Sequence, residues 1–196
     1  YVALGVRAGH LALTALAIEQ NLGMEEVISI VETNNCFSDG IQVVTGCTFA
    51  NNALIYRDLG KTAVTVAKRD GTAVRVALRA DYSDSFDDRH PEAASLFRKI
   101  VRERQEPTPE EQKRLMHLWA EASYAQLDVP AKELFNVQHT QITAPAYAPI
   151  FASVRCALCG ESVMESRARV VDGRPACIAC AAMATYQLDG SGIRVI

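Results

Sequence analysis

The first third of the chain changes from helical to extended spacing of its apolar residues. Apolar side chains recur close to every 3.6 residues from Leu4 to Asn21, which predicts an amphipathic helix closed by Gly23. The short β-branched run from Val27 to Thr33 (VISIVET) predicts a buried strand. Glu32 is the charged residue of this run, so it either faces solvent or is buried and functional.

Two short helices are expected after this strand. Ser38 or Asp39 can cap the first, because small polar side chains accept hydrogen bonds from the free N–H groups at a helix start. Gly46 can end that helix, since glycine readily adopts the left-handed backbone that helix ends favour. The second short helix is predicted from Asn51 to Leu59.

An alternating pattern then predicts a β-hairpin. Apolar and polar residues alternate in Thr62 to Lys68 and in Ala73 to Leu78, on either side of Asp70-Gly71. An Asp-Gly pair between alternating strands is a strong local signal for a tight hairpin turn. The polar and acidic stretch from Tyr82 to Arg89 is expected to be a loop.

Helical patterns dominate the next segment. One helix is expected from Pro91 to Glu103, and another continues to about Leu127 from a capping box formed by Thr108 and Glu111. A strand is expected from Asn136 to Thr143. Because strands and helices do not alternate as β-α-β units, the order predicts an α+β fold with a mostly antiparallel sheet.

The Ala/Pro-rich stretch APAYAPIF, residues 144 to 151, is expected to be a linker. We therefore predict a core domain over residues 1–150 and a small domain over residues 151–196.

Composition and charge narrow the class of protein. The chain has 196 residues, a hydrophobic fraction of 49% and a net charge of −3, so it can build an ordinary core and has no general excess of positive charge. We therefore do not expect a nucleic-acid partner. The apolar start is interrupted by Arg7, His10 and Glu19 and lacks a basic leader, so neither a membrane span nor a signal peptide is predicted. These features indicate a cytoplasmic protein whose thiols are reduced.

Four of the six cysteines form two pairs near the C-terminus. Their spacing, Cys156-x2-Cys159-x17-Cys177-x2-Cys180, is typical of a structural zinc site with four thiolate ligands. The alternatives are two disulfides or a redox-active pair. A turn at Asp172-Gly173 and an Ala-rich segment expected to be helical after Cys177 make the module similar to a treble-clef zinc finger.

The other two cysteines flank the first of the short helices. Cys36 directly precedes the helix start, where the helix dipole favours a thiolate, and Asp39 follows one turn later as a cap or a functional carboxylate. Cys47 comes after Gly46 at the far end. The two cysteines either share a metal, if the chain bends at Gly46, or are separate buried thiols.

The segments LGVRAG and ETNNCFSDGIQVVTGCTFANNALIYRDLGKTAVTV resemble the core of the FmdE family, named for an accessory component of molybdenum formylmethanofuran dehydrogenase. The resemblance implies an α+β core, an appended zinc finger and a homodimer. It implies that Cys36, Asp39 and Cys47 line a cleft that resembles an active or metal site, with a second metal in the core. The family usually carries an HGHxCP motif directly before the LGxRAG helix, and this chain starts after that position.

Three functions are compatible with these features. The resemblance favours a metal-binding accessory protein of a molybdenum or tungsten enzyme. The second is a stand-alone enzyme that depends on a metal or on a thiol at Cys36, and the sequence leaves open whether the chain is an enzyme. The third is a regulator that binds protein or nucleic acid through its zinc finger.

Overall fold

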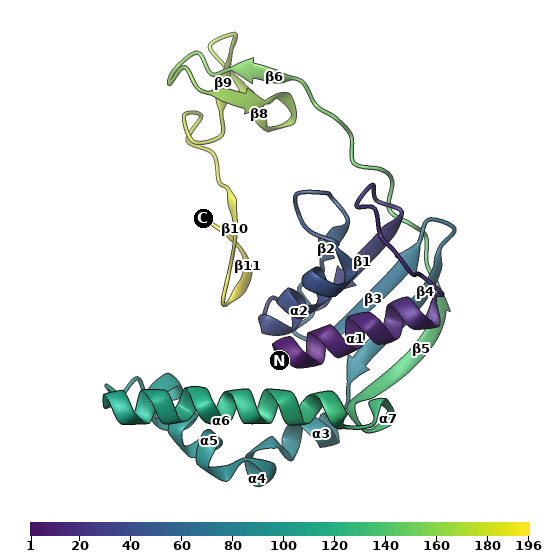
Figure 1. Cartoon of the computed structure of the whole chain (residues 1–196). Coiled ribbons are helices and arrows are strands. Elements are labelled where there is room, and N and C mark those ends of the chain that lie inside the picture. The colour runs from purple at the N-terminus through teal and green to yellow at the C-terminus, as the bar shows by residue number, and fades with distance from the viewer. The chain divides into compact units, whose positions relative to one another are not determined.

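A five-stranded sheet forms the centre of the first of two compact units, Tyr1–Pro145 and Ala146–Ile196, in the computed structural model of the whole chain (Figure 1). Its strand order is β2-β1-β3-β4-β5. The strands are β1 (Val27–Val31), β2 (Leu54–Tyr56), β3 (Ala63–Lys68), β4 (Thr72–Leu78) and β5 (Phe135–Gln141).

The sheet is mostly antiparallel, as predicted. Only β1 and β2 run parallel, and the other three pairs of neighbours are antiparallel. The predicted hairpin is formed by β3 and β4, in which Val64 faces Val76 and Val66 faces Val74. These four valines are fully buried, so the alternating pattern reflects one apolar face.

Two helices cover this apolar face. They are α1 (Val2–Ala15) and α2 (Cys36–Thr45), and α1 lies across β3 and β4 in Figure 1. Leu4 and Ala8 of α1 join Phe37 and Ile41 of α2 and the strand valines in one core cluster.

The two helices approach each other through glycines. A Cβ atom on Gly5 would lie 2.0 Å from the carbonyl oxygen of Phe37, and one on Gly40 would lie 2.3 Å from that of Val2. Real Cβ atoms are not found so close to backbone atoms. Glycine at these two positions therefore permits the helix crossing that places the start of α2 beside the start of α1.

A helical layer connects β4 to β5. It contains α3 (Ala80–Asp84), α4 (Phe86–Arg89), α5 (Pro91–Phe97), a π-helical turn (Arg98–Arg102), α6 (Pro109–Asp128) and α7 (Ala131–Leu134). The predicted capping box is present, since the Thr108 side chain accepts from the Glu111 N–H and the Glu111 side chain accepts from the Thr108 N–H. Arg7 of α1 donates to the carbonyls of Gln126 and Val129, which ties the C-terminal end of α6 to the core.

Four local predictions are wrong. The first helix ends at Ala15 rather than near Gly23, because the chain turns through a left-handed Ala17. Asn35, and not Ser38 or Asp39, caps α2 by accepting from the Phe37 N–H. The expected helix over 51–59 is strand β2, and the expected loop over 82–89 is largely helical, in α3 and α4.

The second unit consists of three two-stranded sheets and short turns. They pair β6 (Ser153–Arg155) with β7 (Ser162–Met164), β8 (Ala168–Val171) with β9 (Arg174–Cys177), and β10 (Tyr186–Asp189) with β11 (Gly192–Val195). Asp172-Gly173 makes the predicted turn, with φ of 50° and 74°. The helix expected after Cys177 is not formed, because that segment makes turns and then enters the hairpin of β10 and β11.

Candidate metal centre and core cavity

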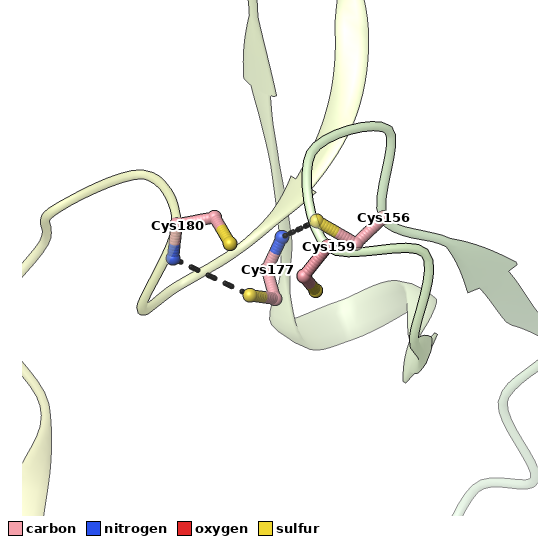
Figure 2. Close-up of side chains that lie close together, drawn as sticks. All are labelled: Cys156, Cys159, Cys177 and Cys180. Atoms are coloured by element: carbon pink, nitrogen blue, oxygen red, sulfur yellow. Dashed lines mark hydrogen bonds between the residues drawn. The ribbon is translucent and has the colours of Figure 1, made fainter.

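The four C-terminal cysteines converge, as their spacing predicted. Their sulfur atoms all lie within 4.8 Å of one another, and Figure 2 shows the side chains of Cys156, Cys159, Cys177 and Cys180 directed toward one space. All four are free thiols, so the disulfide alternative is not what the structure shows.

Each cysteine pair is held by a tight turn. The N–H of Cys156 donates to the carbonyl of Glu161 (2.9 Å), and the N–H of Gly160 donates to the carbonyl of Cys156 (3.0 Å). Gly160 has a φ of 79°, which a residue with a side chain rarely adopts. In the second pair, the N–H of Cys180 donates to Cys177 Sγ at 3.3 Å (Figure 2).

Backbone donors favour the thiolate form at one of the ligands. N–H groups of Cys159, Cys177 and Leu158 point at Cys156 and lower the pKa of its thiol to about 6. Hydrogen bonds from and to the neighbouring thiols, Cys177 first, raise the pKa of Cys180 to about 12. Four thiolates so close together repel one another unless a cation lies between them, and Zn²⁺ prefers four such ligands in tetrahedral geometry.

The residues therefore fit zinc. Four cysteine ligands fill its coordination sphere and leave no position open for a substrate, which is the arrangement of a structural site. The unit from Ala146 to Ile196 has only 51 residues and few buried apolar side chains, so metal binding is the expected source of much of its folding free energy.

The three residues predicted for the core cleft do not come together. Cys36 is the exposed first residue of α2, and Asp39 is exposed one turn later. Cys47 follows the opposite end of this ten-residue helix, which is roughly 15 Å long. Cys36 and Asp39 supply two metal ligands between them, so the three residues do not by themselves form a metal site.

Cys47 is enclosed by backbone and polar groups. Its Sγ lies 3.4 Å from the carbonyl of Val27 and 3.6 Å from the side-chain amide of Asn21. The side chain is fully buried, and burial raises the pKa of its thiol. Cys47 therefore has the environment of a packed, neutral core thiol.

Cys36 instead lies on the wall of a cavity of about 540 Å³. The cavity is bounded by the start of α1, the start of α2 and the helical layer. Its aromatic wall is formed around Trp119, which stacks on Phe86 and meets Phe97 edge to face, each at 5.5 Å between ring centroids. Residues distant in sequence build this cavity, so periodicity alone could not reveal it.

Gln126 is the unusual polar residue of the cavity. It is 5% exposed, lines the cavity, and its side-chain oxygen Oε1 is buried without a hydrogen-bond partner. Buried polar atoms are nearly always paired, because leaving one unpaired costs the full desolvation penalty. No sequence signal distinguishes Gln126, which lies on a helix whose other face carries many exposed polar residues.

Comparison with known proteins identifies both units. The family pattern described as "FmdE, Molybdenum formylmethanofuran dehydrogenase operon" matches residues 1–136. The chain belongs to the FmdE family. A second pattern, the prokaryotic dksA/traR C4-type zinc finger, matches residues 149–186 and covers the four clustered cysteines.

Two individual proteins are similar to this FmdE chain. A probable S-adenosyl-L-methionine-binding protein of Archaeoglobus fulgidus is 41% identical over 98% of the chain, and the chain spans about half (51%) of that relative. The crystal structure of an FmdE-like protein of the tungsten formylmethanofuran dehydrogenase type, from Syntrophus aciditrophicus, superposes with a TM-score of 0.52. That pair shares 20% identity, and the alignment covers 91% of this chain and 83% of the other, which shows a shared FmdE fold.

None of the helices in this FmdE protein is both long and apolar enough to cross a lipid bilayer.

Proposed function

We propose that this metal-binding FmdE protein is an accessory protein of a molybdenum or tungsten enzyme, and that its core cavity binds a ligand while its zinc finger is structural. The observation that carries the proposal is the cavity of about 540 Å³ beside Cys36, within the part of the chain that defines the family. Its size lies within the usual range for small-molecule sites. Its walls offer rings, guanidinium groups and an amide, which bind and orient a ligand, and Cys36 is their one thiol.

The zinc finger supports this assignment in a different way. Its four thiolates form a closed ligand set, so zinc there stabilises a module and does not activate a substrate. A second metal in the core is part of the proposal only where further ligands join Cys36 and Asp39, because a catalytic metal takes three or more protein ligands. The resemblance places such ligands, histidines and a cysteine, directly before α1. We also propose that the chain acts as a homodimer in the cytoplasm, as the resemblance implies.

Affinity purification of the tagged chain from its native organism tests the accessory role. Molybdenum, tungsten and zinc are measured in the eluate, with the tag alone as control. Molybdenum or tungsten in near-stoichiometric amount with the chain is the expected result, and zinc alone would contradict it. A second metal in the isolated chain, beyond one zinc, would indicate a core site formed by Cys36 and Asp39 with other ligands.

S-adenosylmethionine binding is a second candidate, favoured by the name of the Archaeoglobus relative. The name applies to a protein about twice as long as the matched region, so the activity can lie in either half. The cavity argues against it here. Three arginines and one aspartate line its walls, and this positive balance repels the sulfonium cation of that cofactor.

A further inference from the structure

We infer that the core cavity binds an amphipathic aromatic anion that donates a hydrogen bond to Gln126. The inference deepens the proposed function by naming the ligand class of the same cavity. It does not depend on the molybdenum or tungsten partner, because it concerns the isolated chain.

The inner part of the cavity is apolar and aromatic. Leu4 and Ala94 are buried there, and Trp119 is half-buried between the rings of Phe86 and Phe97. Such walls favour a planar, apolar ligand body, since offset stacking and area burial both stabilise it.

One polar atom interrupts this apolar wall. The side-chain oxygen of Gln126 is buried and unpaired, although the Gln126 backbone carbonyl accepts from Arg7 at 2.8 Å. Arg7 thus holds the main chain at this position while the amide oxygen stays available. A carboxamide oxygen accepts hydrogen bonds, so the matching ligand group is an N–H or O–H donor. Water could occupy this position in the free protein, and a donor on the ligand would replace it.

The rim of the cavity carries positive charge. Arg89, Arg98 and Arg102 line it, with Asp87 as the one acidic residue. Arg98 is 3.9 Å from Asp87, a long contact between two exposed side chains, and Arg89 lies over the Tyr82 ring at 3.8 Å. Arg102 lies 5.9 Å from the centre of the Phe97 ring. An anionic group on the ligand would meet these guanidinium groups, which bind carboxylates, sulfonates and phosphates well.

The single tryptophan makes the inference directly measurable. Trp119 is the only tryptophan of the chain and lies on the cavity wall. The probe is 8-anilinonaphthalene-1-sulfonate, which combines an aromatic body, an N–H donor and an anionic group. Energy transfer from Trp119 to bound probe reports binding at the cavity, whereas probe bound far from Trp119 gives a weaker transfer signal.

Titration of the purified chain is expected to give one probe per chain and strong energy transfer. Gln126→Met keeps the side-chain volume and removes the acceptor, and should weaken probe binding about fivefold. The same substitution should raise the Tm by a few degrees, because it removes an unpaired buried polar atom. A purely structural role for Gln126 would lower the Tm instead. Gln112→Met, at an exposed position of α6, is the matched control and should change neither quantity.

Charge is tested in the same way. Arg98→Gln combined with Arg102→Gln should weaken binding several-fold at low salt, and the difference should shrink as salt is added. Lys113→Gln, an exposed cation of α6 outside the cavity, is the control. Tighter binding of S-adenosylmethionine than of the probe would overturn the inference, as would probe binding that Gln126→Met and Gln112→Met affect equally. Absence of energy transfer at saturating probe would also overturn it.

Discussion

Glu32 and Arg75 form a two-pronged ion pair across strand β3. Arg75 Nε donates to Glu32 Oε1 and Arg75 Nη2 donates to Glu32 Oε2, each at 2.7 Å. Glu32 follows β1 and Arg75 lies in β4, so the pair links two strands that do not hydrogen-bond to each other. The Glu32 side chain is 8% exposed. Its burial within an apolar segment therefore has a structural explanation in a paired charge.

Glu32→Gln should lower the free energy of unfolding by about 2 kcal/mol near pH 7, because it leaves the Arg75 guanidinium without its charged partner. The Arg75 hydrogen bonds are the main cause that lowers the pKa of Glu32 below its ordinary value of 4.5, and charges on Arg75, Lys61 and Arg57 add to the effect. Because the folded pKa is lowered, the stabilisation is present above pH 4.5 and is lost as pH falls through the folded pKa.

Urea unfolding of both proteins between about pH 3 and pH 7 measures this difference. The gap between Glu32→Gln and the unaltered chain should close at the acid end, where Glu32 is protonated in both states. Asp81→Asn removes a fully exposed pair with Arg79 and should have a smaller effect at every pH. A gap that stays constant across this range would show that the charge of Glu32 is not its source.

Gly40→Ala should destabilise the core strongly. The new methyl group would lie 2.3 Å from the Val2 carbonyl oxygen and 2.6 Å from the Val6 nitrogen, so the backbone of α1 would have to move. Overpacking of this kind costs roughly 3 kcal/mol, more than the ~1 kcal/mol that alanine gains over glycine in a helix.

Gly9→Ala is the graded control for this prediction, because its methyl group would meet mainly the Val44 side chain, at 3.1 Å. A side chain can shift where backbone cannot. Thermal unfolding should therefore rank the chains as Gly9→Ala close to unaltered and Gly40→Ala far below. Equal Tm values for the two variants would contradict the proposed helix contact.

Zinc should be present at one ion per chain and should depend on the C-terminal cysteines. Cys177→Ser removes one of four ligands, so zinc content should fall well below one and the unit from Ala146 to Ile196 should become sensitive to protease. Cys36→Ser, at an exposed cysteine outside the cluster, should retain the full zinc content. Elemental analysis and limited proteolysis measure both effects, and unchanged zinc in Cys177→Ser would remove the basis for the site.

The features predicted best were those encoded by neighbouring residues. Asp70-Gly71 specified the hairpin, Thr108 and Glu111 specified a capping box, and the CxxC spacing specified the metal ligands. Each of these depends on contacts within a few positions or on ligand chemistry. The predicted helix over 51–59 failed because three residues there pair with β1, a contact that local propensity does not contain.

The features that were missed depend on tertiary contacts. Gln126 resembles any polar residue of a helix until the folding of α1 and the helical layer encloses its side chain. Glu32 needed Arg75, which is 43 positions away, before its burial could be explained. The treble-clef expectation after Cys177 relied on Ala-rich composition, yet the chain there is directed by metal-ligand turns and by the last hairpin.

The two core cysteines should differ sharply in thiol reactivity. Cys36 is exposed at the start of α2, whereas Cys47 is fully buried and burial raises the pKa of its thiol. Since the thiolate is the reactive form, iodoacetamide should label Cys36 rapidly in the native chain and Cys47 only after unfolding. Peptide mass spectrometry of zinc-loaded protein separates these sites from the four metal ligands, which zinc protects. Comparable labelling rates at Cys36 and Cys47 would instead favour the shared cleft that the sequence suggested, because both thiols would then be accessible from the same solvent-filled space.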